Sequence, residues 1–581
     1  MLERRVLAVC AALIVVMGSG AVRAQSAAGS PAAGELTDET RARVDKVFAE
    51  FDKADSPGCA VAIVRDGQIA YARGYGMASL EHANPITPQT VFDIGSTSKQ
   101  FAAACIHMLA RDGKLTLDDD VRKWLPEMRD YGKPITIRHL LHHTSGIRDY
   151  LGLMQLGGRN VMNDYSDAEV IALIAKQREL NFVPGDEHLY SNSGYFLLSA
   201  IVQRAAGVTM RQYAAKHIFE PLGMKSTHFH DDPLEVVKNR ALGYSRKEPG
   251  GYAMDISLFH VVGDGGVYTT VEDLAKWDRV FYDSPLAGGK ALIDGMLVPG
   301  RLNNGTTLEY ASGLTVPMYL GVRTIRHGGA WAGYRAEMLR FPDQRTTVIV
   351  LANLGDSNPS ALANAVADIV LEKELKPLPA AAASNPATTA GSEKLTDVQT
   401  KLVEGLYWEA KSDRLRRVAV TDGKAKYIRG IIDGPGASTP LVATGERSLR
   451  LVGIPQVIEL VFAPAENGRP KRFTITVDGG EPSVFEAVDT TPLGKDKLTD
   501  FAGEYDSDEI GARLRISVEG DRLAMSLPLQ PGAAPLTHVS GDWFSGPVSV
   551  RFERAADGSV KGFRAGAGRM RNIEFTRAAH K

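Results

Sequence analysis

Ser96 and Lys99 stand three residues apart at the start of a predicted helix. The helix is indicated by apolar residues with helical spacing, which are Phe101, Ala104, Cys105, Met108 and Leu109. Because one turn separates Ser96 from Lys99, both side chains face the same side of the helix. A serine hydroxyl becomes a good nucleophile when a base takes its proton, and a semi-buried lysine amine can be that base. The spacing therefore predicts nucleophilic catalysis at Ser96.

Two further motifs carry polar side chains that could complete such a site. Tyr190-Ser191-Asn192 precedes an apolar helix, and residues two apart in an extended stretch point to the same side. We therefore expect Tyr190 and Asn192 to face one site together. His327-Gly328-Gly329-Ala330 lies just before a predicted strand pair at 335–341 and 346–351. Its glycines would let a substrate approach the strand backbone.

In this order, Ser96-x-x-Lys99, Tyr190-Ser191-Asn192 and His327-Gly328-Gly329 resemble the motifs of the serine β-lactamase/penicillin-binding protein superfamily. The resemblance is greatest to class C β-lactamases and the related esterases and D-aminopeptidases, and it covers roughly residues 40–375. Strands at both ends of this region with helices between them favour an α/β (α+β) layer arrangement. The resemblance implies an antiparallel sheet flanked by helices, a helical subdomain, and no metal or organic cofactor.

The resemblance also implies a role for each motif residue. Ser96 would attack a carbonyl carbon and form an acyl-enzyme, and Lys99 and Tyr190 would share the role of base. Which of these two holds the proton stays open. Asn192 would hydrogen-bond Lys99 or a substrate amide. The N–H groups of Ser96 and Ala330 would form the oxyanion hole, and Gly328 and Gly329 would contact the substrate.

His327 departs from the pattern of this superfamily. Penicillin-binding proteins and most β-lactamases have Lys-Thr-Gly or Lys-Ser-Gly here, and that lysine provides a fixed charge for a substrate carboxylate. A histidine is largely neutral at pH 7. We therefore expect His327 to weaken binding of substrates that carry a free carboxylate and to favour esters, amides or peptides recognised at their amino end.

These residues predict an exported serine hydrolase that acts on peptides, including those of D-amino acids, on amides or on esters. One alternative is a β-lactamase or D,D-carboxypeptidase acting on penicillins or peptidoglycan peptides. Another is a non-catalytic binding or scaffold protein, although a scaffold has no need of Ser96, Lys99 and Tyr190 together. The formal net charge of −2 gives no reason to expect nucleic acid or an anionic membrane as a partner, and it leaves the oligomeric state open.

Three other stretches are weaker candidates for chemistry. His139 and His143 have the spacing of a zinc pair, but Leu140 stands where a metalloprotease has glutamate, so a packed helix end is favoured. Ser145 lacks the glycine two residues earlier that a nucleophile elbow requires, and a turn is expected there. The glycines at 263–266 are not followed by a phosphate-loop lysine, which favours close backbone packing.

The first 24 residues have the pattern of a cleaved signal peptide. Arg4 and Arg5 precede an apolar stretch at 6–17, and Val22-Arg23-Ala24 is a small-residue cleavage site. We expect a periplasmic or secreted protein without stable membrane insertion, with an uncleaved anchor as the alternative. The remaining cysteines, Cys59 and Cys105, lie in an apolar strand and on the apolar helix face, which favours buried thiols over a disulfide.

Composition and an internal repeat divide the rest of the chain. The catalytic region would span 25–375, and an Ala-, Pro- and Ser-rich linker would span 376–394. Beyond it, Gly405-Leu406-Tyr407 resembles Gly503-Glu504-Tyr505 within two sets of short alternating strands. We therefore predict two barrel-like all-β units, at 395–490 and 491–581.

Overall fold

The computed structural model describes most of the chain outside its N-terminus and a stretch after the catalytic region. The described residues are 36–283, 285–376, 394–410, 414–429, 438–452, 457–477, 482–491 and 493–579. The predicted signal peptide and nearly all of the predicted linker lie outside these ranges. Within them, every helix is too short or too polar to span a bilayer.

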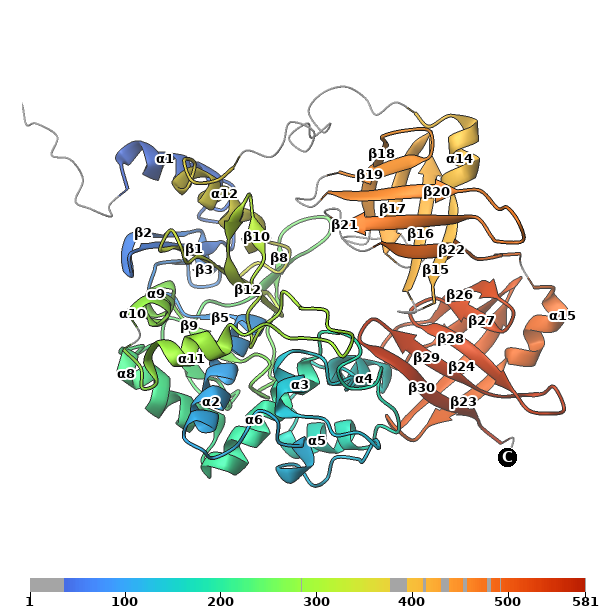
Figure 1. Ribbon diagram of the computed structural model, residues 1–581, viewed down its shortest axis with the longest axis horizontal. Helices are drawn as coiled ribbons and strands as arrows, with labels where there is room; N and C mark the ends of the chain where they lie inside the picture. Colours follow the sequence, from blue (N-terminus) through green and yellow to red (C-terminus); the bar gives the residue numbers. More distant parts are fainter. Residues whose placement is uncertain are drawn as a thin grey trace, which may run out of the picture.

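A five-stranded antiparallel sheet organises the catalytic region, and its strands come from both the beginning and the end of that region (Figure 1). The strand order is β12-β13-β14-β1-β2. The strands are β1 Cys59–Arg65, β2 Gln68–Tyr75, β12 Ile325–Trp331, β13 Tyr334–Phe341 and β14 Thr346–Ala352. The predicted strand pair after His327 is thus confirmed as β13 and β14, and it joins the β1–β2 hairpin through the pairing of β14 with β1.

Helices cover both faces of this sheet, so its central strands are apolar on both sides. In β1, Val61 and Ile63 belong to the core under α1 (Asp38–Val47) and α12 (Pro359–Val370). The alternate residues of β1, together with those of β14, face the larger core that includes α2 (Lys99–Arg111) and α9 (Val271–Asp278). Cys59 and Cys105 are free, buried thiols in these cores, as predicted.

With Pro126, Pro134 and Gly146 as breaks, the sequence of residues 115–180 predicts a mainly helical stretch, and this prediction is wrong. Its helices are short and separated by loops, because capping residues such as Thr136, Asp149 and Ser166 start each one afresh. Between residues 115 and 222 the helices are η2 Val121–Lys123, α3 Ile137–Leu141, α4 Tyr150–Leu156, α5 Asp167–Ala175, α6 Asn192–Ala206, α7 Met210–Ala214, η3 Ala215–Phe219 and α8 Glu220–Leu222.

Smaller elements complete the catalytic region. Two helices follow α9, namely α10 Val280–Asp283 and α11 Gly289–Met296, and a 3-10 turn, η1 Gly95–Ser98, precedes α2. The short strands are β3 Met77–Ser79, β4 Asn84–Pro85, β5 Phe92–Asp93, β6 His228–Phe229, β7 Tyr244–Arg246, β8 Tyr252–Met254, β9 Val267–Thr269, β10 Met318–Tyr319 and β11 Val322–Arg323.

The C-terminal part forms two closed eight-stranded barrels, which confirms the predicted all-β repeat (Figure 1). In each barrel the repeated tyrosine donates to a carbonyl four residues earlier: Tyr407 to Val403 and Tyr505 to Phe501, both at 2.8 Å. The first barrel comprises α14 Asp397–Val403, β15 Gly405–Glu409, β16 Arg414–Thr421, β17 Lys424–Arg429, β18 Ser438–Ala443, β19 Ser448–Leu451, β20 Ile458–Ala463, β21 Arg472–Val477 and β22 Ser483–Ala487. The second comprises α15 Lys495–Leu498, η4 Thr499–Phe501, β23 Gly503–Ser507, β24 Ala512–Glu519, β25 Arg522–Ser526, β26 Ala533–Ser540, β27 Trp543–Ser545, β28 Ser549–Arg554, β29 Val560–Ala567 and β30 Met570–Arg577.

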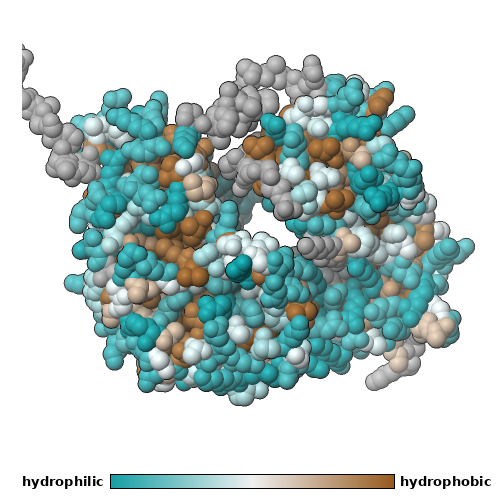
Figure 2. Space-filling model, viewed as in Figure 1, coloured by the Kyte–Doolittle hydropathy of each residue, from teal (hydrophilic) through white to brown (hydrophobic). Residues whose placement is uncertain are grey.

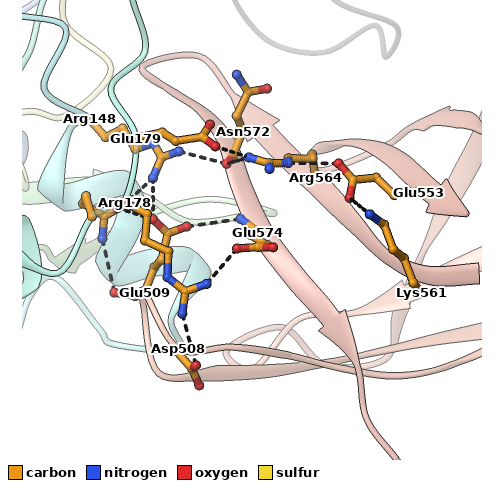
Figure 3. Close-up of polar contacts among 11 residues, drawn as sticks. Arg148, Arg178, Glu179, Asp508, Glu509, Glu553, Lys561, Arg564, Asn572 and Glu574 are labelled. Carbon is orange, nitrogen blue, oxygen red and sulfur yellow. Dashed lines mark hydrogen bonds and ion pairs between the residues drawn. The ribbon is translucent and has the colours of Figure 1, made fainter. Parts of the chain in front are cut away.

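The second barrel packs directly on the helical part of the catalytic region. Its apolar residues belong to the same core cluster as those of α2 and α6, whereas the first barrel has a core of its own. Polar contacts reinforce the junction (Figure 3): Arg148 pairs with Glu509 at 3.0 Å, and Arg178 pairs with Glu574 at 2.7 Å. In the space-filling view the surface is hollowed between the catalytic region and the barrels (Figure 2).

Candidate active site

Ser96 and Lys99 lie together at the start of α2, as their spacing predicts. Ser96 is in the 3-10 turn η1, which continues directly into α2. The Lys99 Nζ donates to Ser96 Oγ at 3.0 Å. A poor nucleophile is thus held at hydrogen-bond distance from a potential base.

Lys99 is fully buried, and three oxygen atoms surround its amine. In addition to Ser96 Oγ, these are Asn192 Oδ1 at 3.0 Å and the backbone oxygen of Asp264 at 2.5 Å. An ammonium group donates three hydrogen bonds, and these three oxygens can accept all of them. A neutral amine would donate two hydrogen bonds, and its lone pair could take the proton of the Ser96 hydroxyl. The site can therefore hold Lys99 before and after a proton transfer from the serine.

Tyr190 and Asn192 reach the same pocket from the start of α6. Ser191 is extended and immediately precedes Asn192, the first residue of α6, so the predicted extended stretch is shorter than expected. Both side chains nevertheless line the cavity with Ser96. The centre of the Tyr190 ring lies 4.9 Å from Lys99 Nζ. The tyrosine and the lysine are thus neighbours, as a shared role would require.

Strand β12 lies tightly against the serine turn. A Cβ on Gly329 would lie 1.9 Å from the Ile94 oxygen, and a Cβ on Gly95 would lie 2.7 Å from the Ala330 nitrogen. Only glycine allows this approach, and Gly95 also has a φ of +47°. The Ala330 backbone is therefore placed beside the turn that carries Ser96, where two N–H groups could face one oxyanion.

His327 lines the pocket, but both of its ring nitrogens have protein partners. Its Nδ1 donates to the Gly328 oxygen at 2.6 Å, which leaves Nε2 to accept from the Tyr310 hydroxyl at 3.2 Å. Burial, together with the positive charge of Lys99, lowers the pKa of His327 to about 4, although the Gly328 contact opposes this. His327 is therefore neutral at pH 7, as expected from its residue type.

This low pKa predicts a contribution of His327 to acid lability. The histidine pKa is about 6.5 in the unfolded chain and about 4 in the folded one, so the unfolded state binds more protons between these values. The stability that neutral His327 contributes is complete above pH 6.5 and is lost as the pH falls towards 4, by about 3 kcal/mol. We expect His327→Asn to flatten the curve of unfolding free energy against pH in this window. Equal slopes for both proteins would contradict this prediction.

The pocket around these residues encloses about 550 Å³. One wall is aromatic: the ring centre of Phe259 lies 6.0 Å from that of Tyr150 and 5.6 Å from that of Trp331. The substrate-facing residues predicted from the sequence all line it, and they are Ser96, Tyr190, Asn192, His327, Gly328, Gly329 and Ala330. The cavity thus combines a polar centre with an apolar side.

Several residues that shape the site were not predicted. His143 packs on Tyr190 with ring centres 4.1 Å apart and accepts from the Ser191 N–H. The Asp264 carboxylate accepts from the Tyr150 hydroxyl at 2.9 Å. In the sequence, the glycines at 263–266 were the one feature that drew attention to Asp264. Arg569, from the turn between β29 and β30, lines the pocket although it follows Ser96 by hundreds of residues.

The other candidates from the sequence do not form sites. His139 completes the capping box of α3, and His143 has left the helix with a φ of +55°. Ser145 is buried and its Oγ accepts from the Ile147 N–H, as in a turn. Among the described residues, one group has the spacing of metal ligands: His228, His230 and Glu235.

That group has a competing partner within the protein. Arg211 donates to both carboxylate oxygens of Glu235, at 2.6 and 2.8 Å. His228 Nε2 and His230 Nδ1 lie 3.2 Å apart, so a hydrogen bond between the two rings accounts for their approach. We therefore assign these residues to the packing of β6.

Comparison with known proteins agrees with this geometry. Residues 44–372, more than half of the chain, match the family described as Beta-lactamase. A D-aminopeptidase of Gluconobacter oxydans is 27% identical and aligns with 93% of this chain and 100% of its own length. Penicillin-binding protein 4* of Bacillus subtilis is 32% identical over 50% of this chain and 67% of its own.

The fold has a counterpart among solved structures. The octameric penicillin-binding protein homologue from Pyrococcus abyssi superposes with a TM-score of 0.53 at 25% identity, covering 77% of this chain and 99% of that one. The family match spans α1 to α12 and includes all three motifs. The protein is therefore a serine hydrolase that belongs to the β-lactamase family.

Proposed function

We propose that the protein hydrolyses amide or peptide bonds through an acyl-enzyme on Ser96. The contact that carries this proposal is the 3.0 Å hydrogen bond between Lys99 Nζ and Ser96 Oγ inside the pocket. Ser96 Oγ bonds to the carbonyl carbon as its proton passes to the base, and the proton then goes to the departing amine. Water releases the acyl group in a second cycle with the same base.

Lys99 is the better placed of the two candidate bases. It contacts Ser96 directly, whereas Tyr190 is its neighbour on the pocket side. In this proposal Asn192 holds the Lys99 amine, and the N–H groups of Ser96 and Ala330 stabilise the oxyanion. Gly328 and Gly329 keep the strand open to the substrate backbone, and His327 supports that strand as a neutral side chain.

The substrate class follows from the relatives and from the pocket. The D-aminopeptidase aligns along nearly the whole chain, which supports peptides or amides, including those of D-amino acids. The wall of Phe259, Tyr150 and Trp331 suits an apolar substrate side chain. Penicillin-binding protein 4* favours a penicillin or peptidoglycan peptide as the second candidate substrate.

We further propose export, with cleavage after Ala24, and a chain divided into a catalytic region at 25–375, a linker at 376–394 and β units at 395–490 and 491–581. The charged start, apolar stretch and small-residue site of the first 24 residues support export. The separate core of the first barrel supports its independence. The core shared by the second barrel supports a unit that acts together with the catalytic region.

A substrate panel tests the proposed activity. The mature protein and its Ser96→Ala variant are assayed with D- and L-aminoacyl p-nitroanilides, p-nitrophenyl esters and a chromogenic cephalosporin. We expect turnover of an anilide that disappears in the variant. Turnover of the cephalosporin alone would favour the second candidate, and no turnover of any substrate would favour a binding or scaffold protein.

A further inference from the structure

The turn between β29 and β30 carries a residue of the second barrel into the candidate active site. Arg569 lines the same cavity as Ser96 and Tyr190. Its backbone oxygen accepts from the Asp149 N–H at 3.2 Å and from Asn181 Nδ2 at 2.9 Å. Because these bonds involve only the main chain of Arg569, the turn is held in place independently of its side chain.

The Arg569 guanidinium lies close to the catalytic lysine. Its central carbon is 4.7 Å from the centre of the Tyr190 ring, and Lys99 Nζ is 4.9 Å from the same centre. The two cations therefore lie within about 10 Å of each other, both against one aromatic ring. A group bound by Arg569 would therefore lie in the same pocket as a carbonyl at Ser96.

This guanidinium has donors to spare. Its side chain is 48% exposed, and within the described part of the chain it makes no hydrogen bond. It forms one long ion pair, with Nη1 3.7 Å from Asp149 Oδ2, and that carboxylate also accepts from the N–H groups of Leu151 and Asn192. The other arginine of the pocket, Arg335, donates instead to backbone oxygens.

The acids that line the pocket are not available to bind a substrate cation. Asp93 and Asp264 are buried, and each has an internal donor: the Gly95 N–H and the Tyr150 hydroxyl. His327 is neutral and has both nitrogens occupied. The cavity therefore presents an exposed cation to the substrate, without an exposed carboxylate of its own among its lining residues.

We propose that Arg569 binds a carboxylate of the substrate, so that the protein prefers peptides or amides with a free carboxylate near the bond that is cleaved. A guanidinium suits this role because it offers paired donors to both carboxylate oxygens. The assignment rests on the proposed function, since it orients a substrate for Ser96. From His327 alone, the sequence predicted a preference for substrates recognised at their amino end. The proposed preference differs because the second barrel supplies a cation, Arg569, that the catalytic region does not provide at position 327.

Two pairs of thioesters test this assignment. In the first pair, a thioester joins benzoylglycine to the sulfur of mercaptoacetic acid, so the leaving thiol carries the carboxylate. In the second pair, the acyl group is succinyl and carries the carboxylate itself. Each is compared with its methyl ester by the release of thiol. We expect Arg569→Gln to lower the ratio of kcat/KM between acid and methyl ester in one pair by about tenfold to a hundredfold. That pair identifies the side on which the carboxylate lies.

Matched variants separate charge from geometry. Arg569→Lys keeps the charge and should retain part of the ratio, and Arg335→Gln should change it less than Arg569→Gln. An unchanged ratio in both pairs for Arg569→Gln would overturn the assignment. Competition with fluorophosphonate labelling tests the same assignment without turnover. Benzoylglycine should slow the labelling of Ser96 more than benzoylglycinamide does, and this difference should vanish in Arg569→Gln. Absence of labelling at Ser96 would instead refute the proposed function.

Discussion

Replacement of Ser96 with alanine is expected to abolish covalent labelling by a fluorophosphonate probe, and Lys99→Ala is expected to slow it by about 10²- to 10⁴-fold. The reason is the direct bond between Lys99 Nζ and Ser96 Oγ in a site where the lysine is fully buried. Labelling rates are measured by mass spectrometry of the modified peptide. Circular dichroism checks that each variant is folded.

A second serine provides the control for this experiment. Ser145 was the rival nucleophile in the sequence, but it is buried in a turn where its Oγ accepts from the Ile147 N–H. In the Ser145→Ala variant, the probe should therefore still label Ser96, at a rate that can be compared with that of the unmodified protein. Labelling that persists in Ser96→Ala would place the nucleophile elsewhere, and a Lys99→Ala rate equal to that of the unmodified protein would remove Lys99 as the base.

Glu509→Ala is expected to destabilise the protein by about 3–5 kcal/mol. Glu509 forms an ion pair with Arg148 across the junction with the second barrel, and their side chains are only 2% and 0% exposed (Figure 3). The carboxylate also accepts from the backbone N–H groups of Arg178 and Glu574. Its removal leaves a buried guanidinium charge uncompensated, which chemical denaturation would report as a lower midpoint.

Asp508, the neighbouring acid, is the matched control. Its pair with Arg178 is at the surface, where the Asp508 side chain is 88% exposed, so Asp508→Asn should cost less than about 1 kcal/mol. Replacing both buried partners, as in Arg148→Met with Glu509→Leu, should recover much of the loss, because no charge is then left unpaired. A loss in Glu509→Ala no larger than that in Asp508→Asn would contradict this explanation.

The amino-acid sequence by itself determined the elements that carry the chemistry. Helical spacing placed Ser96 and Lys99 on one face of a helix, and strand patterns predicted the pair that follows His327 and the repeated strands after residue 395. These predictions succeeded because periodicity is a local property of the chain. The same reasoning overestimated the helices between 115 and 180, where caps such as Thr136 and Ser166 divide the segment.

Only the tertiary structure decided which polar and charged groups surround the nucleophile. Asp264 meets Lys99 through its backbone oxygen, a contact that no side-chain pattern encodes. Arg569 reaches the pocket because the second barrel shares a core with the catalytic region and its turn is bonded to Asp149 and Asn181. Such contacts depend on how two separately patterned units pack together, and sequence periodicity carries no information about that packing.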